Sequence, residues 1–494
     1  MPLPSRLVIA LTGLAALPLT AQSTPYVPLD DPLRPAFEHL VARGEVDDPS
    51  PQRRPFHRRD ALLALDSAAA RGTLRDTAIA GRLRASWAED TAEARWELAA
   101  AAGAQGYTDA RRDVLHPAGP DGVRPLAEVR VEAHYGPVVL VTRPTLEPRV
   151  AKDPDWSGRH NLKVTGRHPE AYLALQFRYG ELFYGQQEQS WGPALFPGIG
   201  VSDAAYPRPA LGLTLGTARL GLTAQATTLE DATDSTGTTI NRYFFLHRLH
   251  ARLGRRLELG LWETTVLAGP GRSFGPRFRN PVTLLLLANE YGLGDDGNIM
   301  LGADVTWRLG AARLQAQLGL DDFQYQPGKA PNRFAFSLQA EGPLGRAMAW
   351  RAGYSQASSL AFRTARPFEA FTEEGVGLGR NFADNDQVTV TVSAPVGGWM
   401  VSPELTLLRQ GEGRINDPWP TGQGLADTPT LFLGTVERTW RAALDVRGRH
   451  GPLALHLNAG VHRLQNADHV EGRGRTEFVG RLQATLGTRW RGRL

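Results

Sequence analysis

The sequence has no cysteine among its 494 residues. This excludes disulfide bonds, thiolate metal sites, lipid attachment to an N-terminal cysteine and cysteine-based catalysis. Long apolar runs are also missing beyond the N-terminus, and the mean hydropathy of −0.29 excludes a polytopic helical membrane protein. The net charge is only +4, and the arginines are spread along the chain rather than clustered. We therefore expect no nucleic-acid partner.

The N-terminus has the pattern of a secretory signal. Arg6 provides a positive charge, residues 7–19 form a short apolar stretch, and small residues follow, so residues 1–21 are predicted to be a signal peptide. The apolar stretch is too short to span a bilayer comfortably. We therefore expect an exported mature protein.

Residues 22–92 have helical periodicity. In Asp30-Asp31-Pro32-Leu33 an aspartate suits a helix N-cap and the proline suits a first turn, and Gly44 can end the helix. The apolar residues between them recur at helical spacing: Leu33, Phe37, Leu40 and Val41. Two further helices are predicted near residues 60–71 and after residue 73. Together the three predict a small helical bundle.

From about residue 93 onward the pattern changes to a period of two, which is typical of β-strands. One such strand places apolar residues on one face: Ile299, Leu301, Ala303, Val305, Trp307 and Leu309. Its other face is polar or small: Asn298, Gly302, Asp304, Thr306 and Arg308. A sheet that faces lipid on one side and a polar lumen on the other requires this alternation.

Tight turns and long connections alternate along residues 93–494, as in a transmembrane antiparallel β-barrel. The long connections are predicted at residues 108–125, 146–160, 185–209, 229–241, 268–298, 321–332, 357–386, 409–430 and 464–474. With eight tight turns between them they require about eighteen strands. To reach an even number we assign residues 95–107 as the first strand, against their helix propensity. Residues 281–288 are kept within a loop for the same reason. The predicted fold is mainly β.

The predicted barrel indicates a location in the bacterial outer membrane, with the bundle in the periplasm and the long loops outside the cell. Outer-membrane lipid is then one partner. Leu486 and Trp490 keep the alternation near the C-terminus, as expected of a strand presented to the barrel assembly machinery. We expect a monomer.

Several short segments, in order along the chain, resemble the Wzi-type outer-membrane capsule-assembly family. They are Tyr26-Val27-Pro28-Leu29-Asp30, Trp191-Gly192-Pro193 with Ser202 and Ala205-Tyr206-Pro207, His247-Arg248-Leu249, Leu259-Gly260-Leu261 with Glu263, Arg279-Asn280-Pro281 and Asp321-Asp322-Phe323. The resemblance implies an eighteen-stranded barrel with a periplasmic helical bundle. It also implies a lectin that ties capsular polysaccharide to the cell surface.

Polysaccharide binding requires aromatic faces for the sugar rings and polar side chains for the hydroxyls. The loops offer a candidate set of both kinds: Trp156, Trp191, Tyr206, Arg279, Asp321, Asp322, Asn416, Asp417 and Trp419. For any one of these residues, packing between loops is the better explanation. For the set, glycan binding is the better one.

Catalysis and cofactor binding have little support in the sequence. Ser190 and Ser202 have no neighbouring base and no nucleophile-elbow motif. The histidines of the predicted strands are scattered rather than clustered, so neither a metal nor another cofactor is expected. We expect a binding protein and no enzyme. The alternatives are a general porin, which requires an open lumen, and, with less support, a barrel hydrolase.

Overall fold

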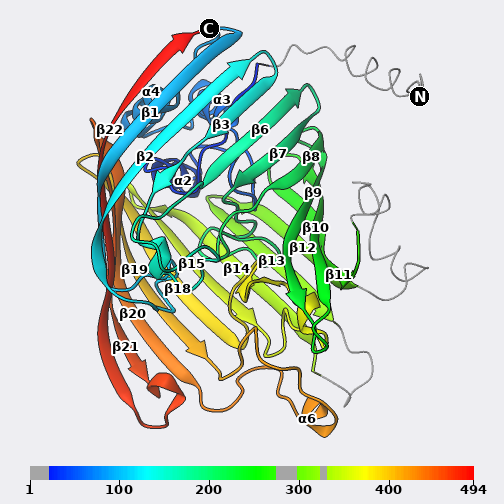
Figure 1. Ribbon diagram of the computed structural model, residues 1–494. Helices are drawn as coiled ribbons and strands as arrows, with labels where there is room; N and C mark the ends of the chain where they lie inside the picture. Colours follow the sequence, from blue (N-terminus) through cyan, green and yellow to red (C-terminus); the bar gives the residue numbers. More distant parts are fainter. Residues whose placement is uncertain (1–21, 274–296, 323–330) are drawn as a thin grey trace, which may run out of the picture.

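The computed structural model describes residues 22–273, 297–322 and 331–494 (Figure 1). The predicted signal peptide, Arg279 and the segment 281–288 lie outside the described residues. The described chain is dominated by one antiparallel sheet that closes on itself, because β1 pairs with both β2 and β22.

Eighteen strands form the barrel wall, as predicted: β1 (Ala94–Tyr107), β2 (Gly122–Tyr135), β3 (Val138–Thr142), β6 (Glu170–Phe177), β7 (Gly180–Gln187), β8 (Ala210–Gly216), β9 (Leu220–Thr233), β10 (Thr239–Leu253), β11 (Leu257–Pro270), β12 (Gly297–Leu309), β13 (Ala312–Asp322), β14 (Arg333–Leu344), β15 (Met348–Ala357), β18 (Asn385–Val396), β19 (Trp399–Gln410), β20 (Glu437–His450), β21 (Leu453–Gln465) and β22 (Gly474–Arg493). The assignment of the first strand is confirmed. Its alanine-rich sequence favours a helix, but pairing along both edges satisfies the whole backbone of β1, and the membrane requires that.

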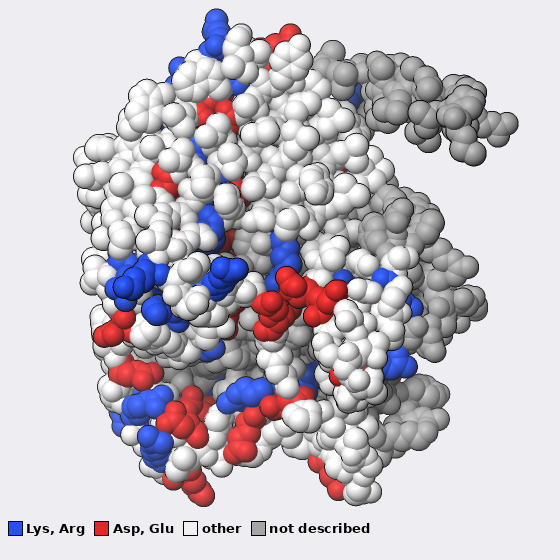
Figure 2. All heavy atoms as spheres, viewed as in Figure 1, with Lys and Arg blue, Asp and Glu red and all other residues white. Residues whose placement is uncertain are grey.

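The side chains of the wall alternate as the sequence predicts. On β12, Leu301 and Trp307 are exposed on the outer face, whereas Asp304 is buried on the inner face. Figure 2 shows the consequence on one face of the molecule: the upper part is mostly uncharged, and charged side chains gather toward the lower end, where the loops lie. The uncharged outer wall is the surface that a bilayer requires.

Two predicted connections need correction. Residues 229–241 were expected to form a long loop, but β9 and β10 extend toward each other and leave only residues 234–238 between them. The Asp234 carboxylate accepts hydrogen bonds from the backbone of Thr236 and Thr238, which stabilises a tight turn there. The predicted loop 146–160 is longer than expected and spans residues 143–169, because β3 has only five residues.

The wall is low on one side of the barrel. Strands β3, β6, β7 and β8 have five to eight residues, whereas their neighbours β2 and β9 have 14 each. Two short strands, β4 (Thr145–Leu146) and β5 (Gly166–Arg167), continue this part of the wall. The loop 188–209, which follows β7, folds inward beside them and contacts the helical segment at Ser190.

The helical segment contains α2 (Arg34–Ala42), α3 (Arg58–Ala70) and α4 (Thr77–Trp87). Their apolar faces form one buried core, as the periodicity predicts, around residues such as Phe37, Leu40 and Trp87. The first helix begins after the Asp31 carboxylate accepts a hydrogen bond from the Leu33 amide. It ends where Gly44 takes a positive φ of 70°, which glycine adopts without a steric penalty.

The bundle occupies the lumen at the end of the barrel where the tight turns and the C-terminus lie (Figure 1). Arg43 donates to the backbone carbonyls of Arg346 and Met348 on one turn, and Gln52 donates to those of Val305 and Ala316. Within the described residues, no helix combines the length and the apolar character that crossing a membrane requires.

Buried ion pairs join the bundle to the wall. Arg54 contacts Glu38 at 2.7 Å and Asp48 at 2.9 Å, and Asp48 also contacts Arg313 of β13 at 2.7 Å. Arg313 in turn pairs with Glu341 of β14. Each charge has an opposite partner, which buried charges require because water cannot solvate them.

Candidate functional site

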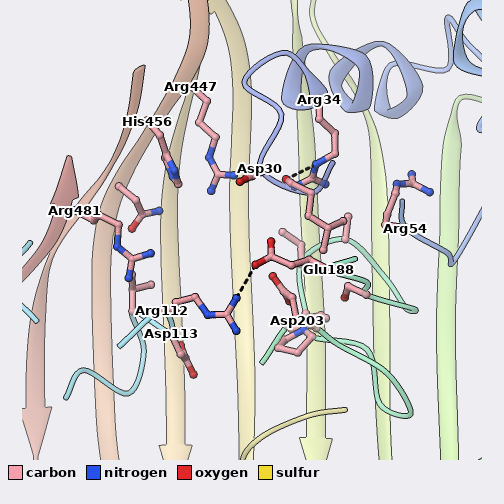
Figure 3. A pocket seen from close by; sticks show the side chains of 18 of the residues that line it. Asp30, Arg34, Arg54, Arg112, Asp113, Glu188, Asp203, Arg447, His456 and Arg481 are labelled. Carbon is pink, nitrogen blue, oxygen red and sulfur yellow. Dashed lines mark hydrogen bonds and ion pairs between the residues drawn. The ribbon is translucent and has the colours of Figure 1, made fainter. Parts of the chain in front are cut away.

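A cavity of about 460 Å³ lies in the lumen between the bundle, the inward-folded loops and the strands β1 and β20–β22. In Figure 3, Arg447, His456 and Arg481 come from the wall, while Asp30 of the bundle and Glu188 lie opposite. A second cavity of about 400 Å³ lies beside the bundle and shares four lining residues with the first: Asp30, Arg447, His456 and Gln483. The end of the barrel that the bundle occupies therefore still contains cavities lined by polar side chains, along one side of the wall.

Most carboxylates of this lumen cavity already have cationic partners. Glu188 contacts Arg112 at 3.0 Å and Arg167 at 2.5 Å, and Glu147 contacts Arg167 at 2.7 Å and Arg149 at 2.9 Å. Burial alone would raise the pKa of Glu147, but the two guanidinium groups outweigh burial and lower its pKa to about 2. These pairs hold the loops together and leave few free groups for a ligand.

A second, outer pocket of about 230 Å³ lies at the loop end, at the tips of strands β19–β22. Loops that are far apart in sequence contribute to it through His116, Phe382, Arg414 and His469. The rings of His116 and Phe382 stack with centroids 3.5 Å apart, and Arg414 approaches His469 to 2.6 Å. We refer to it below as the outer pocket.

Several buried side-chain atoms of residues that line the outer pocket have no hydrogen-bond partner within the described part of the chain. Two of them, Nδ1 of His462 and Oε1 of Glu477, face each other 4.0 Å apart. His462 is only 1% exposed. Buried polar atoms are normally satisfied. A hydroxyl group placed between them could hydrogen-bond to both, so this pocket is suited to a hydroxylated ligand.

The structure brings together two of the predicted glycan-binding residues, Trp156 and Tyr206, whose ring centroids are 6.5 Å apart. Tyr206 is buried, with the guanidinium group of Arg112 4.0 Å from its ring and its hydroxyl donating to Asp153. Trp156 is half-buried. These contacts hold the loops 108–121, 143–169 and 188–209 together.

Trp191 lies in the core of the inward-folded loops. It is 3% exposed and packs in a cluster that includes Ile199 and Trp262, and its carbonyl accepts from Gln317. Its prediction as a glycan-binding residue remains untested, and its burial disfavours that role. The segment around it is a filling of the barrel lumen.

Arg333 contacts both Asp321 and Trp419. Arg333 contacts the Asp321 carboxylate at 3.3 Å, and its guanidinium carbon lies 5.2 Å from the centre of the Trp419 ring. Asp321 also accepts from the backbone amide of Phe362 and is buried, whereas Trp419 is half-buried. Of Asp322 the structure describes the backbone alone.

Asn416 and Asp417 are exposed in the loop 411–436. The Asn416 amide donates to the Gly375 carbonyl at 2.6 Å, and the Asp417 carboxylate accepts from the Arg414 backbone amide. Asp417 therefore adjoins the outer pocket. The predicted set is divided between several places, and among its members described by the structure only Asp417 lies beside that pocket.

Sequence reasoning missed the residues of the outer pocket. His462 is one of the scattered histidines of the predicted strands, and Glu477 lies on the polar face of the last strand. The sequence does not reveal that pair, because its two members meet only through the register of β21 with β22, which places His462 opposite Glu477. Among the described residues, no three His, Asp or Glu side chains are placed to hold a metal ion.

Residues 104–337 match the model of the family described as capsule assembly protein Wzi. Among solved structures, Escherichia coli Wzi is described as an outer membrane protein involved in group 1 capsule assembly and a carbohydrate-binding β-barrel. It is similar over 94% of this chain and 99% of its own, with 16% identity and a TM-score of 0.59.

More distant similarities lead to barrels of another group. Acinetobacter baumannii OccAB1 has 10% identity over 81% of this chain and 96% of its own, with a TM-score of 0.46. Pseudomonas aeruginosa OccD3 has 11% identity over 80% of this chain and 91% of its own, also with a TM-score of 0.46. No curated protein matches the chain.

The family match covers the first part of the barrel, including β2–β13, and the closed eighteen-stranded fold is shared with Wzi over nearly the whole chain. Both agree with the resemblance found in the sequence. Residues 104–337, a little under half of the chain, therefore match the capsule assembly protein Wzi family, and the chain has the β-barrel fold of Escherichia coli Wzi.

Proposed function

We propose that this barrel binds surface or capsular polysaccharide at its loop end and thereby assists the attachment or assembly of that polysaccharide. The loops then face outward from the cell, and the bundle faces the periplasm. The observation that carries the proposal is the outer pocket, where His462 and Glu477 present unsatisfied polar atoms beside Arg414 and His469. The description of Escherichia coli Wzi as carbohydrate-binding supports the same function.

The chemistry of the pocket suits a sugar. Carboxylate oxygens accept from hydroxyl groups, and guanidinium groups donate to hydroxyl and ring oxygens. Arg441 donates to Nε2 of His462, so Nδ1 of this imidazole carries the hydrogen and can donate to a sugar oxygen. The pocket has a volume of about 230 Å³ and is partly open to solvent, so part of a longer sugar chain can enter it. A polymer would pass across the mouth of the pocket, so that binding requires no chain end.

The test is a titration of the purified protein with fragments of the cell's own polysaccharide. Glu477→Gln keeps the shape of the side chain but removes its charge, and a hydrogen bond to a charged group contributes about 1.5–3 kcal/mol. We expect affinity to fall about tenfold or more. Glu471→Gln, at the exposed tip of the neighbouring loop, is the matched control. Equal affinity of both variants and the unaltered protein would reject the pocket as the site.

A general porin is the second candidate, and the filled lumen opposes it. The bundle closes one end of the barrel, and the loop around Trp191 fills its middle. Conductance in planar bilayers separates the two functions. The proposal expects no steady ion current from the intact protein, and an open-channel current from single molecules would favour the porin. We propose no catalytic activity.

A further inference from the structure

The low part of the barrel wall poses a problem for a membrane protein. The apolar band of an outer-membrane barrel is about 25 Å tall. The five residues of β3 rise about 17 Å even along the strand axis, and strand tilt shortens this further. Something beyond β3 must therefore complete the lipid-facing wall beside β2.

The small ribbon of β4 and β5 does so. Leu146 of β4 is paired with Ala127 of β2 and with Gly166 of β5, so it shares the outward face of the wall. Leu146 is 37% exposed, and Val164, two residues before Gly166, is 71% exposed. Together with the exposed Leu162, these side chains extend the apolar outer face into the loop 143–169.

The same segment is basic. Residues 156–168 contain no aspartate or glutamate, and Arg159, His160, Lys163 and His168 are all exposed. Among the described residues, Arg159 and Lys163 form no ion pair or hydrogen bond. Most arginines of the lumen cavity, by contrast, are paired with carboxylates. Free cations next to exposed apolar side chains, at the loop-end edge of a lipid-facing wall, are placed for a membrane interface.

The segment is held in position rather than loose. The Glu147 amide donates to the Thr165 carbonyl at 2.9 Å, and the Glu147 carboxylate contacts Arg167 at 2.7 Å. His160 lies 3.1 Å from the carbonyl of Ala151 through Nδ1. Because these contacts fix the base of the segment, its backbone does not have to be ordered by the ligand.

We propose that Arg159 and Lys163 bind the anionic phosphate headgroups of lipids in the leaflet at the loop end of the barrel. Leu162 and Val164 contact the adjoining acyl chains, and the exposed histidines flank the headgroup. A guanidinium group can bind a phosphate through two parallel hydrogen bonds, and the lysine adds a second positive charge. The site is separate from the outer pocket, and its function does not depend on polysaccharide binding.

The test uses the mature protein in detergent, titrated with phosphatidylglycerol and, in parallel, with phosphatidylcholine, with bound lipid counted by native mass spectrometry. The double variant Arg159→Gln/Lys163→Gln should bind phosphatidylglycerol about tenfold to thirtyfold more weakly. Each cation near an anionic lipid surface strengthens binding about fivefold, and the variant removes two. Binding of phosphatidylcholine should be unchanged. The matched control is Arg255→Gln/Arg256→Gln, which removes two exposed arginines from the turn between β10 and β11 at the other end of the barrel.

Heat-dependent migration in gel electrophoresis confirms that each variant is folded. Equal phosphatidylglycerol binding by the Arg159→Gln/Lys163→Gln variant (the patch variant) and by the unaltered protein would overturn the proposal. An equal loss of phosphatidylglycerol binding in the patch variant and the control variant would also overturn it, because it would show general charge attraction. An acidic polymer, polygalacturonate, tests the remaining alternative: a patch variant that loses this polymer while keeping phosphatidylglycerol would assign the segment to a glycan instead.

Discussion

The two ends of the barrel lumen are filled in different ways. At the tight-turn end, the helical bundle forms an apolar core around Phe37 and Trp87, and Asp48 joins it to the wall through fully paired charges. At the loop end, the filling is made of loops held together by ion pairs, with cavities between them and unsatisfied atoms at His462 and Glu477.

The difference indicates that the two ends of the lumen have different roles. A core of interlocking helices closes the barrel, and each of its buried charges has a partner. Loops pack less regularly than helices and leave polar cavities between them. Binding sites are commonly found on loops. Stability should therefore depend mainly on the first end and ligand binding on the second. The following predictions test that contrast, from the largest effect to the smallest.

The largest effect is expected from Asp48→Ala at the bundle end. The change leaves the buried guanidinium groups of Arg54 and Arg313 without their shared partner, which should cost about 4 kcal/mol of bundle stability. Hydrogen exchange of α2 should increase, while the barrel keeps its heat-dependent migration. Asp66→Ala breaks an exposed pair with Arg84 and should cost less than about 1 kcal/mol. Equal exchange in the two variants would contradict the contrast.

Trp191→Ala tests the filling in the middle of the lumen. The side chain is 3% exposed and packs with Ile199 and Trp262, so its removal leaves a cavity and should cost about 3 kcal/mol. Hydrogen exchange should rise in residues 188–209 and not in α3. If Trp191 instead contacted the polysaccharide directly, affinity would fall with no change in exchange.

The link between the bundle and β7 should depend on pH. Burial alone would lower the pKa of His57, but the neighbouring Glu181 carboxylate, 3.0 Å away, outweighs burial and raises it to about 10. The protonated imidazole therefore stabilises the folded state fully below about pH 6.5, the ordinary pKa of histidine, and this stabilisation is lost as the pH rises through 10.

Urea unfolding of the bundle, followed at several pH values, measures this loss. The midpoint should fall between pH 6.5 and 10 in the unaltered protein, and less so in His57→Gln. His160→Gln, in an exposed loop, serves as the control. A midpoint with the same pH dependence in all three proteins would show that His57 is not the titrating group.

The smallest effect on stability is expected from Trp419→Ala. This side chain is half-buried and contacts Arg333 through its ring, an interaction that contributes about 0.5–1 kcal/mol at exposed sites. Thermal stability should hardly change. A loss of polysaccharide affinity in this variant would extend the binding surface from the outer pocket across the loop 411–436, and unchanged affinity would confine the surface to the pocket.

The sequence by itself determined the architecture. Period-two alternation, as in residues 299–309, and the alternation of turns with long connections are local patterns. Strands with these patterns can be arranged in few ways in a membrane, since a closed barrel is needed to pair every backbone group. The parity argument identified β1 correctly although its alanines favour a helix. The three helices were also predicted, because helical periodicity is a pattern of nearby residues. The predicted aspartate N-cap of the first helix was wrong: α2 begins after Leu33, which has no side-chain cap.

Only the tertiary structure decided what fills the barrel and where polar groups meet. The loop around Trp191 folds inward because Gln317 and Trp262, far away in sequence, provide its contacts. The pairing of His462 with Glu477 depends on strand register, and the basic segment at Arg159 continues the wall because β3 is short. Such contacts join residues that no local pattern relates. The sequence therefore specified the barrel, and the three-dimensional packing specified its candidate sites.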